Sequence, residues 1–209
     1  MNNIKYKDVN LYNAMQALSQ NNKALSTEEK KEFAAGRLEL IPASIVLKTM
    51  IADAENQKLI TSQKNKDFRQ GICDFQDGRL LQHGLGGSFV STGIRASWST
   101  HATVTDPAQL SFHYTSWPFD MCHAEIAFTR GSDPLRNVRL SNFIFKGDSP
   151  QDLTSTILDL KAPLVISKDF GLGIELIRPD GVTPAAGNQF LSIEFIGYRL
   201  LPVISTSAG

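Results

Sequence analysis

The amino-acid sequence predicts a mainly β protein, an antiparallel β-sandwich of the jelly-roll kind preceded by an α-helical N-terminal segment. Hydrophobic residues recur with helical spacing in the first part of the chain, and they alternate with polar residues from residue 89 onward. Both tryptophans and most of the 12 phenylalanines lie in the later part, and aromatic side chains favour the half-buried surface of a sheet. The short turns between the alternating segments are typical of sandwiches and jelly rolls.

Residues 1–82 form the predicted helical segment. Its first helix is indicated by three apolar residues at helical spacing, Leu11, Met15 and Leu18. Ser26 lies three residues before Glu29, which is the spacing of a capping box. The sequence therefore predicts that a second helix begins next to Ser26.

A third helix is expected within residues 40–71, where Pro42 would stand in the first helical turn. Leu47 and Ile51 lie four residues apart, so they share one face of this helix. This face could pack on the chain's own sheet or on a neighbouring subunit, and the sequence leaves both arrangements open. In the second arrangement, replacing Leu47 and Ile51 with Asp would prevent assembly and leave the sheet intact.

The segment HGLGGS at residues 83–88 joins the two parts of the chain. It lacks the Gly-Lys-Ser/Thr ending of a phosphate-binding loop, and it does not match the GxGxxG motif. We therefore interpret this segment as a flexible, glycine-rich joint.

Residues 89–209 form the predicted sandwich, and we expect them to fold without the preceding residues. Apolar residues alternate with polar ones from residue 90 to residue 105, as in a long strand with one solvated face. Gly197 lies within the last apolar run and is expected to mark a β-bulge. One helix is predicted within residues 148–160, because Pro150 suits a first helical turn.

The stretch FDMCHAEIAF, residues 119–128, places a cysteine directly beside a histidine. In a strand, adjacent side chains point to opposite faces, so Cys122 faces the core and His123 faces away from it. A thiol in apolar surroundings has a raised pKa and is a poor nucleophile, and His123 cannot act as its base. We therefore predict no catalytic role for Cys122.

His123 and Glu125 share the opposite face of the same predicted strand. Such a pair could be half of a metal site or an acid–base couple, but a solvated surface or a subunit contact is the simpler interpretation. The sequence has no HxH, HxxxH or HxxE motif and no GxSxG motif. We therefore predict no catalytic residues, no bound metal and no cofactor.

Charge and hydropathy restrict the partners that the sequence predicts. The chain has 21 Lys and Arg and 21 Asp and Glu, so its formal net charge is zero and it has no strong nucleic-acid signature. No apolar run approaches the ~18 residues of a membrane-spanning helix. The N-terminus lacks the apolar stretch of a signal peptide, so we expect synthesis in the cytoplasm.

Together these observations predict a non-enzymatic structural protein that assembles with copies of itself and with neighbouring structural proteins into a shell. A virus or phage particle fits best, so the virion is the expected destination of the protein. The alternatives are a carbohydrate- or ligand-binding module with its site near Trp117 and, with less support, a hydrolytic enzyme. Five residues are the interface candidates: Leu47, Ile51, Trp117, His123 and Glu125.

Overall fold

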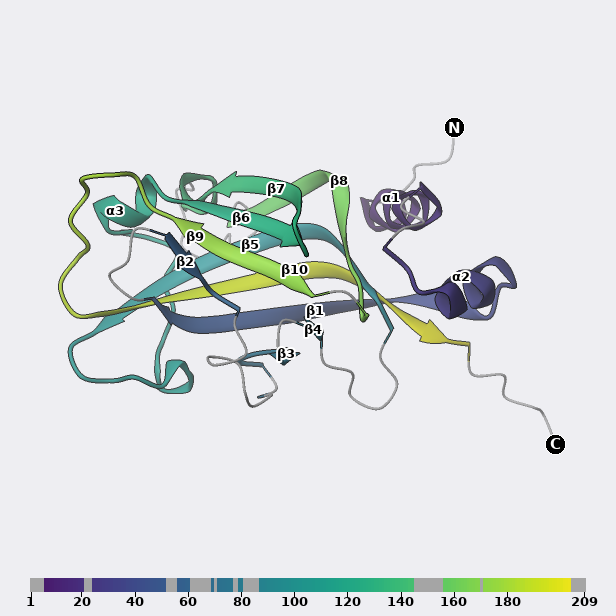
Figure 1. The fold of residues 1–209 in the computed structure, drawn as a ribbon, viewed down its shortest axis with the longest axis horizontal. Coiled ribbons are helices and arrows are strands. Elements are labelled where there is room, and N and C mark those ends of the chain that lie inside the picture. Colours follow the sequence, from purple (N-terminus) through teal and green to yellow (C-terminus); the bar gives the residue numbers. More distant parts are fainter. Residues whose placement is uncertain are drawn as a thin grey trace.

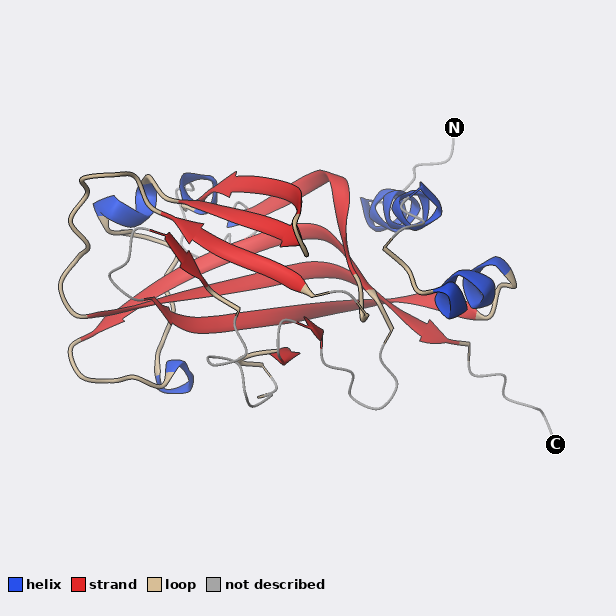
Figure 2. Cartoon of the chain, viewed as in Figure 1, coloured by secondary structure: helices blue, strands red, loops and turns tan. Residues whose placement is uncertain are grey.

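The computed structural model describes residues 6–20, 24–51, 56–60, 69, 71–76, 79–80, 87–144, 156–169 and 171–203. In this part of the chain the protein is mainly β, with two antiparallel four-stranded sheets and a few helices (Figure 1, Figure 2). The prediction of a mainly β protein that begins with helices is confirmed at this level.

The first sheet contains the longest strands. Its order is β1–β10–β5–β8, and these strands are Leu38–Ile51, Asn188–Pro202, Phe89–His101 and Ile157–Ile166. The second sheet has the order β2–β9–β6–β7, and these strands are Asn56–Lys58, Leu172–Ile177, Glu125–Arg130 and Asp133–Arg139. A small two-stranded sheet consists of β3 at Phe75–Gln76 and β4 at Arg79–Leu80.

The strands of the two larger sheets pair in a nested order. With the small β3–β4 hairpin set aside, the first strand β1 pairs with the last strand β10, and the second strand β2 pairs with β9. Further inside, β5 pairs with β8, and β6 pairs with β7. All four pairs are antiparallel, so the chain returns beside itself throughout, with the β6–β7 turn at the centre of the nest.

One hydrophobic core joins the two sheets. Phe195 of β10 belongs to the first sheet, and its ring contacts Phe128 of β6 in the second sheet with 5.7 Å between the ring centroids. Leu47 and Ile51 of β1 are buried in the same core. Because residues two apart on a strand face the same side, alternate residues of both sheets can contribute to one apolar layer.

The first helix packs on the other face of the first sheet, at one end of the molecule (Figure 1). This helix, α1, is Tyr6–Gln20, and its buried residues Ala14 and Leu18 join Val90 of β5 in a second apolar cluster. Val90 follows Phe89, which belongs to the main core, so the cluster lies on the opposite side of the sheet. Helix α1 therefore packs on its own chain.

The second helix, α2 at Thr27–Ala34, is tied to the first sheet through a buried carboxylate. Ser26 and Glu29 form the predicted capping box, in which the Glu29 N–H donates to Ser26 Oγ at 3.0 Å. The Glu29 carboxylate also accepts hydrogen bonds from the Ser88 N–H at 2.8 Å and from the Ser88 hydroxyl at 2.9 Å. Since Ser88 directly precedes β5, these bonds anchor the start of α2 to the sheet.

The prediction of a helix within residues 40–71 is wrong, because residues 38–51 form strand β1. This strand pairs with β10 along its whole length, and its side chains from Ile45 to Ile51 are buried at every second residue. The four-residue spacing of Leu47 and Ile51 places them on one face of a helix and equally on one face of a strand. Both side chains lie in the core, so the structure contradicts their assignment as interface residues.

The end of the predicted helix at residues 148–160 is also a strand, because β8 begins at Ile157. Residues 145–155 lie outside the described part of the chain, as do residues 83–86 of the glycine-rich joint. Both β1 and β2 precede this joint, yet they pair with β10 and β9. The first 82 residues are therefore not all helical, and the structure argues against residues 89–209 folding by themselves.

The β-bulge predicted at Gly197 of β10 lies instead in the neighbouring strand, because Thr92 of β5 is the residue without a partner in the β10–β5 register. The pairing of β10 with β5 shifts register between Ile196 and Gly197. A Cβ atom at this position would lie 1.9 Å from the carbonyl oxygen of Val90, so the absence of a side chain lets the two backbones approach closely.

Candidate functional site

A hollow of about 620 Å³ lies at the end of the molecule that carries the short helix α3, Phe119–Cys122 (Figure 1). It is lined by Phe119, Cys122, His123, Glu125, Arg139, Ser141, Pro179 and Val182. Segments far apart in the sequence thus form its walls. Two of the predicted site residues, His123 and Glu125, lie here together.

A buried polar network joins two walls of this hollow. Asp120 of α3 and Arg178 are both buried, with Arg178 Nε 3.5 Å from Asp120 Oδ2. Gln189 of β10 completes the network, because its amide donates to Asp120 Oδ2 at 3.3 Å and its carbonyl oxygen accepts from Arg178 Nη2. Phe119 adjoins Asp120 and Pro179 adjoins Arg178, so the network holds the backbones of both walls.

Phe119, and not Trp117, is the exposed aromatic residue of this region. Trp117 is buried, and its indole N–H donates to the carbonyl oxygen of Tyr114 at 3.1 Å. Phe119 is 70% exposed, and its ring meets that of His123 at an angle of 60° with 4.5 Å between the centroids. The sequence predicts an exposed aromatic residue beside the Trp117-Pro118 break, and the structure places this role at Phe119, two residues after Trp117.

The sequence predicts that Cys122, His123 and Glu125 alternate along one strand, but the structure shows that they do not. Helix α3 ends at Cys122, and β6 begins only at Glu125, so the phase of a strand does not apply to the first two residues. His123 is exposed beside Phe119, and Glu125 accepts a hydrogen bond from Arg139 Nε at 3.2 Å. The prediction that His123 and Glu125 share one strand face is therefore wrong, although both residues line the same hollow.

The Cys122 thiol is partly buried, and its Sγ lies 3.5 Å from the carbonyl oxygen of Trp117. Burial raises the pKa of this thiol above its ordinary value, and the nearby Asp120 carboxylate raises it further. Both effects disfavour the thiolate, which is the nucleophilic form of cysteine. The arrangement is therefore unsuited to thiol catalysis at neutral pH.

Cys122 should react slowly with thiol reagents, with a pH dependence displaced toward alkaline values. Because only the thiolate reacts and the pKa is raised, less thiolate is present at pH 8 than in an unperturbed cysteine, and the labelling rate should rise at a higher pH than that of a cysteine peptide. Stopped-flow labelling of a Cys73→Ser variant between pH 7 and pH 10, compared with a cysteine peptide, measures this. Labelling of native Cys122 as fast as that of the peptide at pH 7 would contradict the prediction.

A second hollow of about 360 Å³ lies on the outer face of the first sheet. It is lined by polar side chains of β1 and β10, including Lys48 and Glu194, and by aromatic residues of the chain that follows β5. The aromatic rings already have partners, because Lys48 Nζ lies 5.5 Å from the ring centre of Phe112 and Arg95 lies 5.5 Å from that of Tyr114. We interpret this surface as aromatic residues that cover a polar sheet face.

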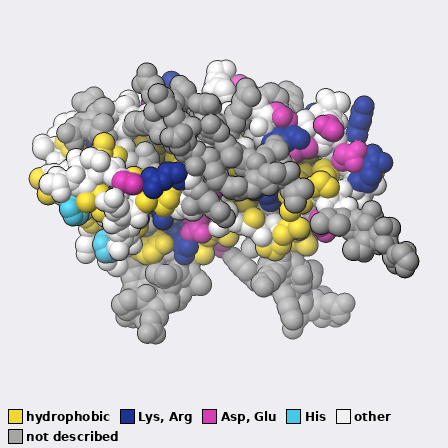
Figure 3. Space-filling view, turned by 90° about the horizontal axis from the view of Figure 1, so that it is seen from below, with side chains coloured by type: hydrophobic (Ala, Val, Ile, Leu, Met, Phe, Trp, Pro, Cys, Tyr) yellow, Lys and Arg dark blue, Asp and Glu magenta, His cyan; other side chains and the backbone are white. Residues whose placement is uncertain are grey.

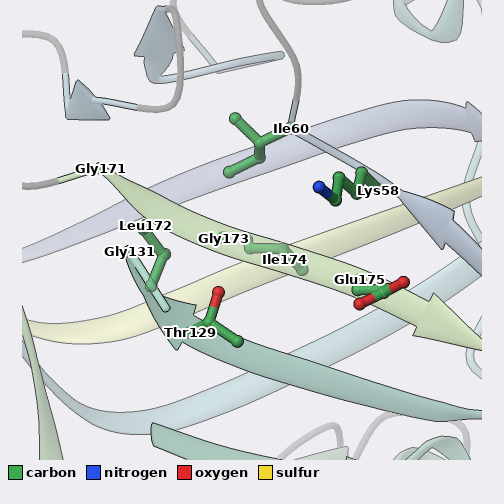
Figure 4. A pocket seen from close by; sticks show the side chains of 9 residues that line it. All are labelled: Lys58, Ile60, Thr129, Gly131, Gly171, Leu172, Gly173, Ile174 and Glu175. Atoms are coloured by element: carbon green, nitrogen blue, oxygen red, sulfur yellow. The ribbon is translucent and has the colours of Figure 1, made fainter. Parts of the chain in front are cut away.

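A third, smaller hollow of about 260 Å³ lies on the second sheet (Figure 4). It exists partly because Gly173 of β9 has no side chain, and a Cβ atom there would lie 2.1 Å from Thr129 Oγ1. Lys58 and Glu175 are its charged residues, and they are directly opposite in the β2–β9 register. Glycine backbone and a pair of opposite charges give this hollow little means of selecting a ligand.

Helix α1 has a row of three exposed apolar side chains on its outward surface, beside exposed polar residues such as Gln16. Val9 is 42% exposed, Tyr12 is 66% exposed and Met15 is 49% exposed, although α1 buries its other side on the sheet. The sequence predicts that Met15 shares one face with Leu18. This prediction is wrong, because Met15 is exposed and Leu18 is buried. No charged residue occurs from residue 9 to residue 20, so this exposed surface has no ionic groups of its own.

Other kinds of site are not supported by the described residues. Among them no group of three or more His, Cys, Asp and Glu side chains is placed to hold a metal ion, and no helix is long and apolar enough to cross a membrane. On the face drawn in Figure 3, the visible Lys and Arg side chains are interspersed with Asp and Glu, without a stripe of one sign among the described residues. No family model, no curated protein and no solved structure matches the chain.

Proposed function

We propose that this chain is a non-enzymatic structural protein, built on a jelly-roll β-sandwich, that assembles with copies of itself into a shell such as a virus or phage particle. The nested pairs support the jelly roll, because winding a chain of four nested antiparallel pairs around a common core produces two four-stranded sheets in this strand order. Jelly rolls occur in viral capsids, but also in lectins and cupins, so the fold alone does not select the function.

The exposed surface of α1 is the observation that carries the proposal. Tyr and Met are enriched at protein interfaces and charged residues are depleted at their centres, and the exposed row of Val9, Tyr12 and Met15 has this composition. Because the row contains no charge, it can pack against the same row of a second copy without repulsion between like charges. A two-fold axis beside this row would bring the rows of two copies together, and contacts elsewhere on the chain would have to join such dimers into a shell.

A Tyr12→Asp variant should lose self-assembly and keep its fold. The new carboxylate would be buried without a partner in the proposed contact, which costs several kcal/mol and weakens association by on the order of a hundredfold or more. Tyr12 is 66% exposed in the single chain, so the fold itself does not depend on this residue. Light scattering and negative-stain imaging measure the assembly, and far-UV circular dichroism measures the fold.

The matched control is Val203→Asp, which changes another exposed apolar residue, 46% exposed and next to the end of β10. This variant should assemble like the wild type. A wild-type protein that stays monomeric at high concentration would contradict the proposal, as would a Tyr12→Asp variant that assembles normally.

The second candidate, a carbohydrate-binding module, is favoured by one observation, the hollow beside Phe119. The third, a hydrolytic enzyme, has no arrangement in its favour among the described residues. A binding site and a structural role are compatible in one chain, so each requires its own test.

A further inference from the structure

We propose that the hollow beside Phe119 binds a neutral pyranose sugar, such as the terminal residue of a glycan. This inference adds a binding activity to the proposed structural role and does not rest on it, because an isolated chain has the complete hollow. Its volume of about 620 Å³ lies within the ~300–1,000 Å³ that is usual for small-molecule sites.

The exposed ring of Phe119 provides the first element of recognition. A pyranose has an apolar face of C–H groups, and aromatic rings in sugar sites stack against this face. The contact with His123 positions the Phe119 ring but leaves it 70% exposed, so the ring remains accessible to a ligand. Exposing a large aromatic side chain loses the stabilisation that burial would give, and this loss is offset if a ligand covers the ring.

The ion pair of Glu125 and Arg139 provides the second element. The Arg139 side chain is 76% exposed, so most of its five N–H donors face the solvent beside the Glu125 carboxylate. Each sugar hydroxyl both donates and accepts, and neighbouring hydroxyls therefore suit a donor and an acceptor placed side by side. Ser141 adds a further hydroxyl to the lining.

The same ion pair explains why the sugar should be neutral. Glu125 compensates the charge of Arg139, so the hollow lacks the unpaired cation that would attract a carboxylate sugar. An anionic ligand would also have to separate the Glu125–Arg139 pair or lie close to the carboxylate. A neutral ligand can hydrogen-bond to both groups without disrupting their contact.

The hollow is also preorganised. The buried network of Asp120, Arg178 and Gln189 connects α3 to the segment that carries Pro179 and Val182. The backbones of these two lining segments are thus held before any ligand arrives. Preorganisation lowers the entropy that a weakly binding ligand must overcome.

Saturation-transfer difference NMR with a panel of methyl glycosides tests the proposal on the full-length protein. The panel contains the neutral glucoside, galactoside, mannoside and N-acetylglucosaminide, together with the α-methyl glycoside of N-acetylneuraminic acid as the anionic probe. At least one neutral glycoside should bind in a saturable way. Phe119→Ala should weaken its binding by about tenfold, and Phe119→Tyr should retain it, because the aromatic face is kept.

Two further variants separate the site from general effects. Arg139→Gln should also weaken binding, whereas Val203→Ala, a truncation of an exposed apolar residue outside the hollow, should leave binding unchanged. The proposal is overturned if no neutral glycoside binds, if only the anionic probe binds, or if Phe119→Ala binds as the wild type does. It is also overturned if Phe119→Ala abolishes assembly and leaves glycoside binding unchanged, since Phe119 would then be an interface residue only. Light scattering on the same samples shows whether the structural role stands or fails separately.

Discussion

Replacing Leu47 with Asp should unfold the protein rather than block its assembly. Leu47 is fully buried in the core that joins the two sheets, and a carboxylate there would have no partner. Even Leu47→Ala should lower the free energy of unfolding by about 2–5 kcal/mol, because it leaves a cavity. Leu47→Asp should therefore lose the β signal in far-UV circular dichroism and the cooperative melt.

Met50→Asp is the matched control for this prediction, because Met50 lies on the same strand and is exposed. It should change the free energy of unfolding by less than about 1 kcal/mol. Leu47→Asp could instead melt like the wild type and lose only its assembly. That result would support the helix face that the sequence predicts to pack on a neighbouring subunit, and it would contradict the assignment of strand β1.

Removing one member of the Asp120–Arg178 pair should be the second large effect. Both side chains are buried, so Asp120→Ala leaves the Arg178 guanidinium without its carboxylate in the interior. Breaking a buried ion pair in this way costs about 3–5 kcal/mol of folding stability. Urea unfolding of Asp120→Ala and Arg178→Ala measures the loss, which should be similar for the two variants.

The exposed pair in the same hollow provides the comparison. Arg139→Ala removes the partner of Glu125, but solvent screens this pair, so the loss should be below about 1 kcal/mol. Equal losses for Arg139→Ala and Arg178→Ala would show that the buried network does not hold the walls of the hollow.

The buried network also links stability to the proposed sugar site. A chain that loses Asp120 loses the support of α3, on which Phe119 is placed. Asp120→Asn keeps the size of the side chain and removes its charge, so it tests how much the position of Phe119 depends on the ion pair. The structure thus separates residues that would touch the sugar from residues that hold them in place.

Local sequence patterns determined two features of this protein without help from the rest of the chain. The alternation that begins at residue 89 predicted strand β5. The spacing of Ser26 and Glu29 predicted the capping box. Each of these features depends on residues within a few positions of one another, so the local sequence contains the required information.

Other features were decided only by the tertiary structure. Residues 38–51 form a strand because β10, about 150 residues away, offers a full row of backbone partners, and the four-residue spacing of Leu47 and Ile51 fits a helix equally well. The hollow beside Phe119 forms because the buried carboxylate of Asp120 meets Arg178 and Gln189, which lie in later segments of the chain. A local pattern cannot distinguish such outcomes, because the free energy that selects them comes from contacts between distant residues.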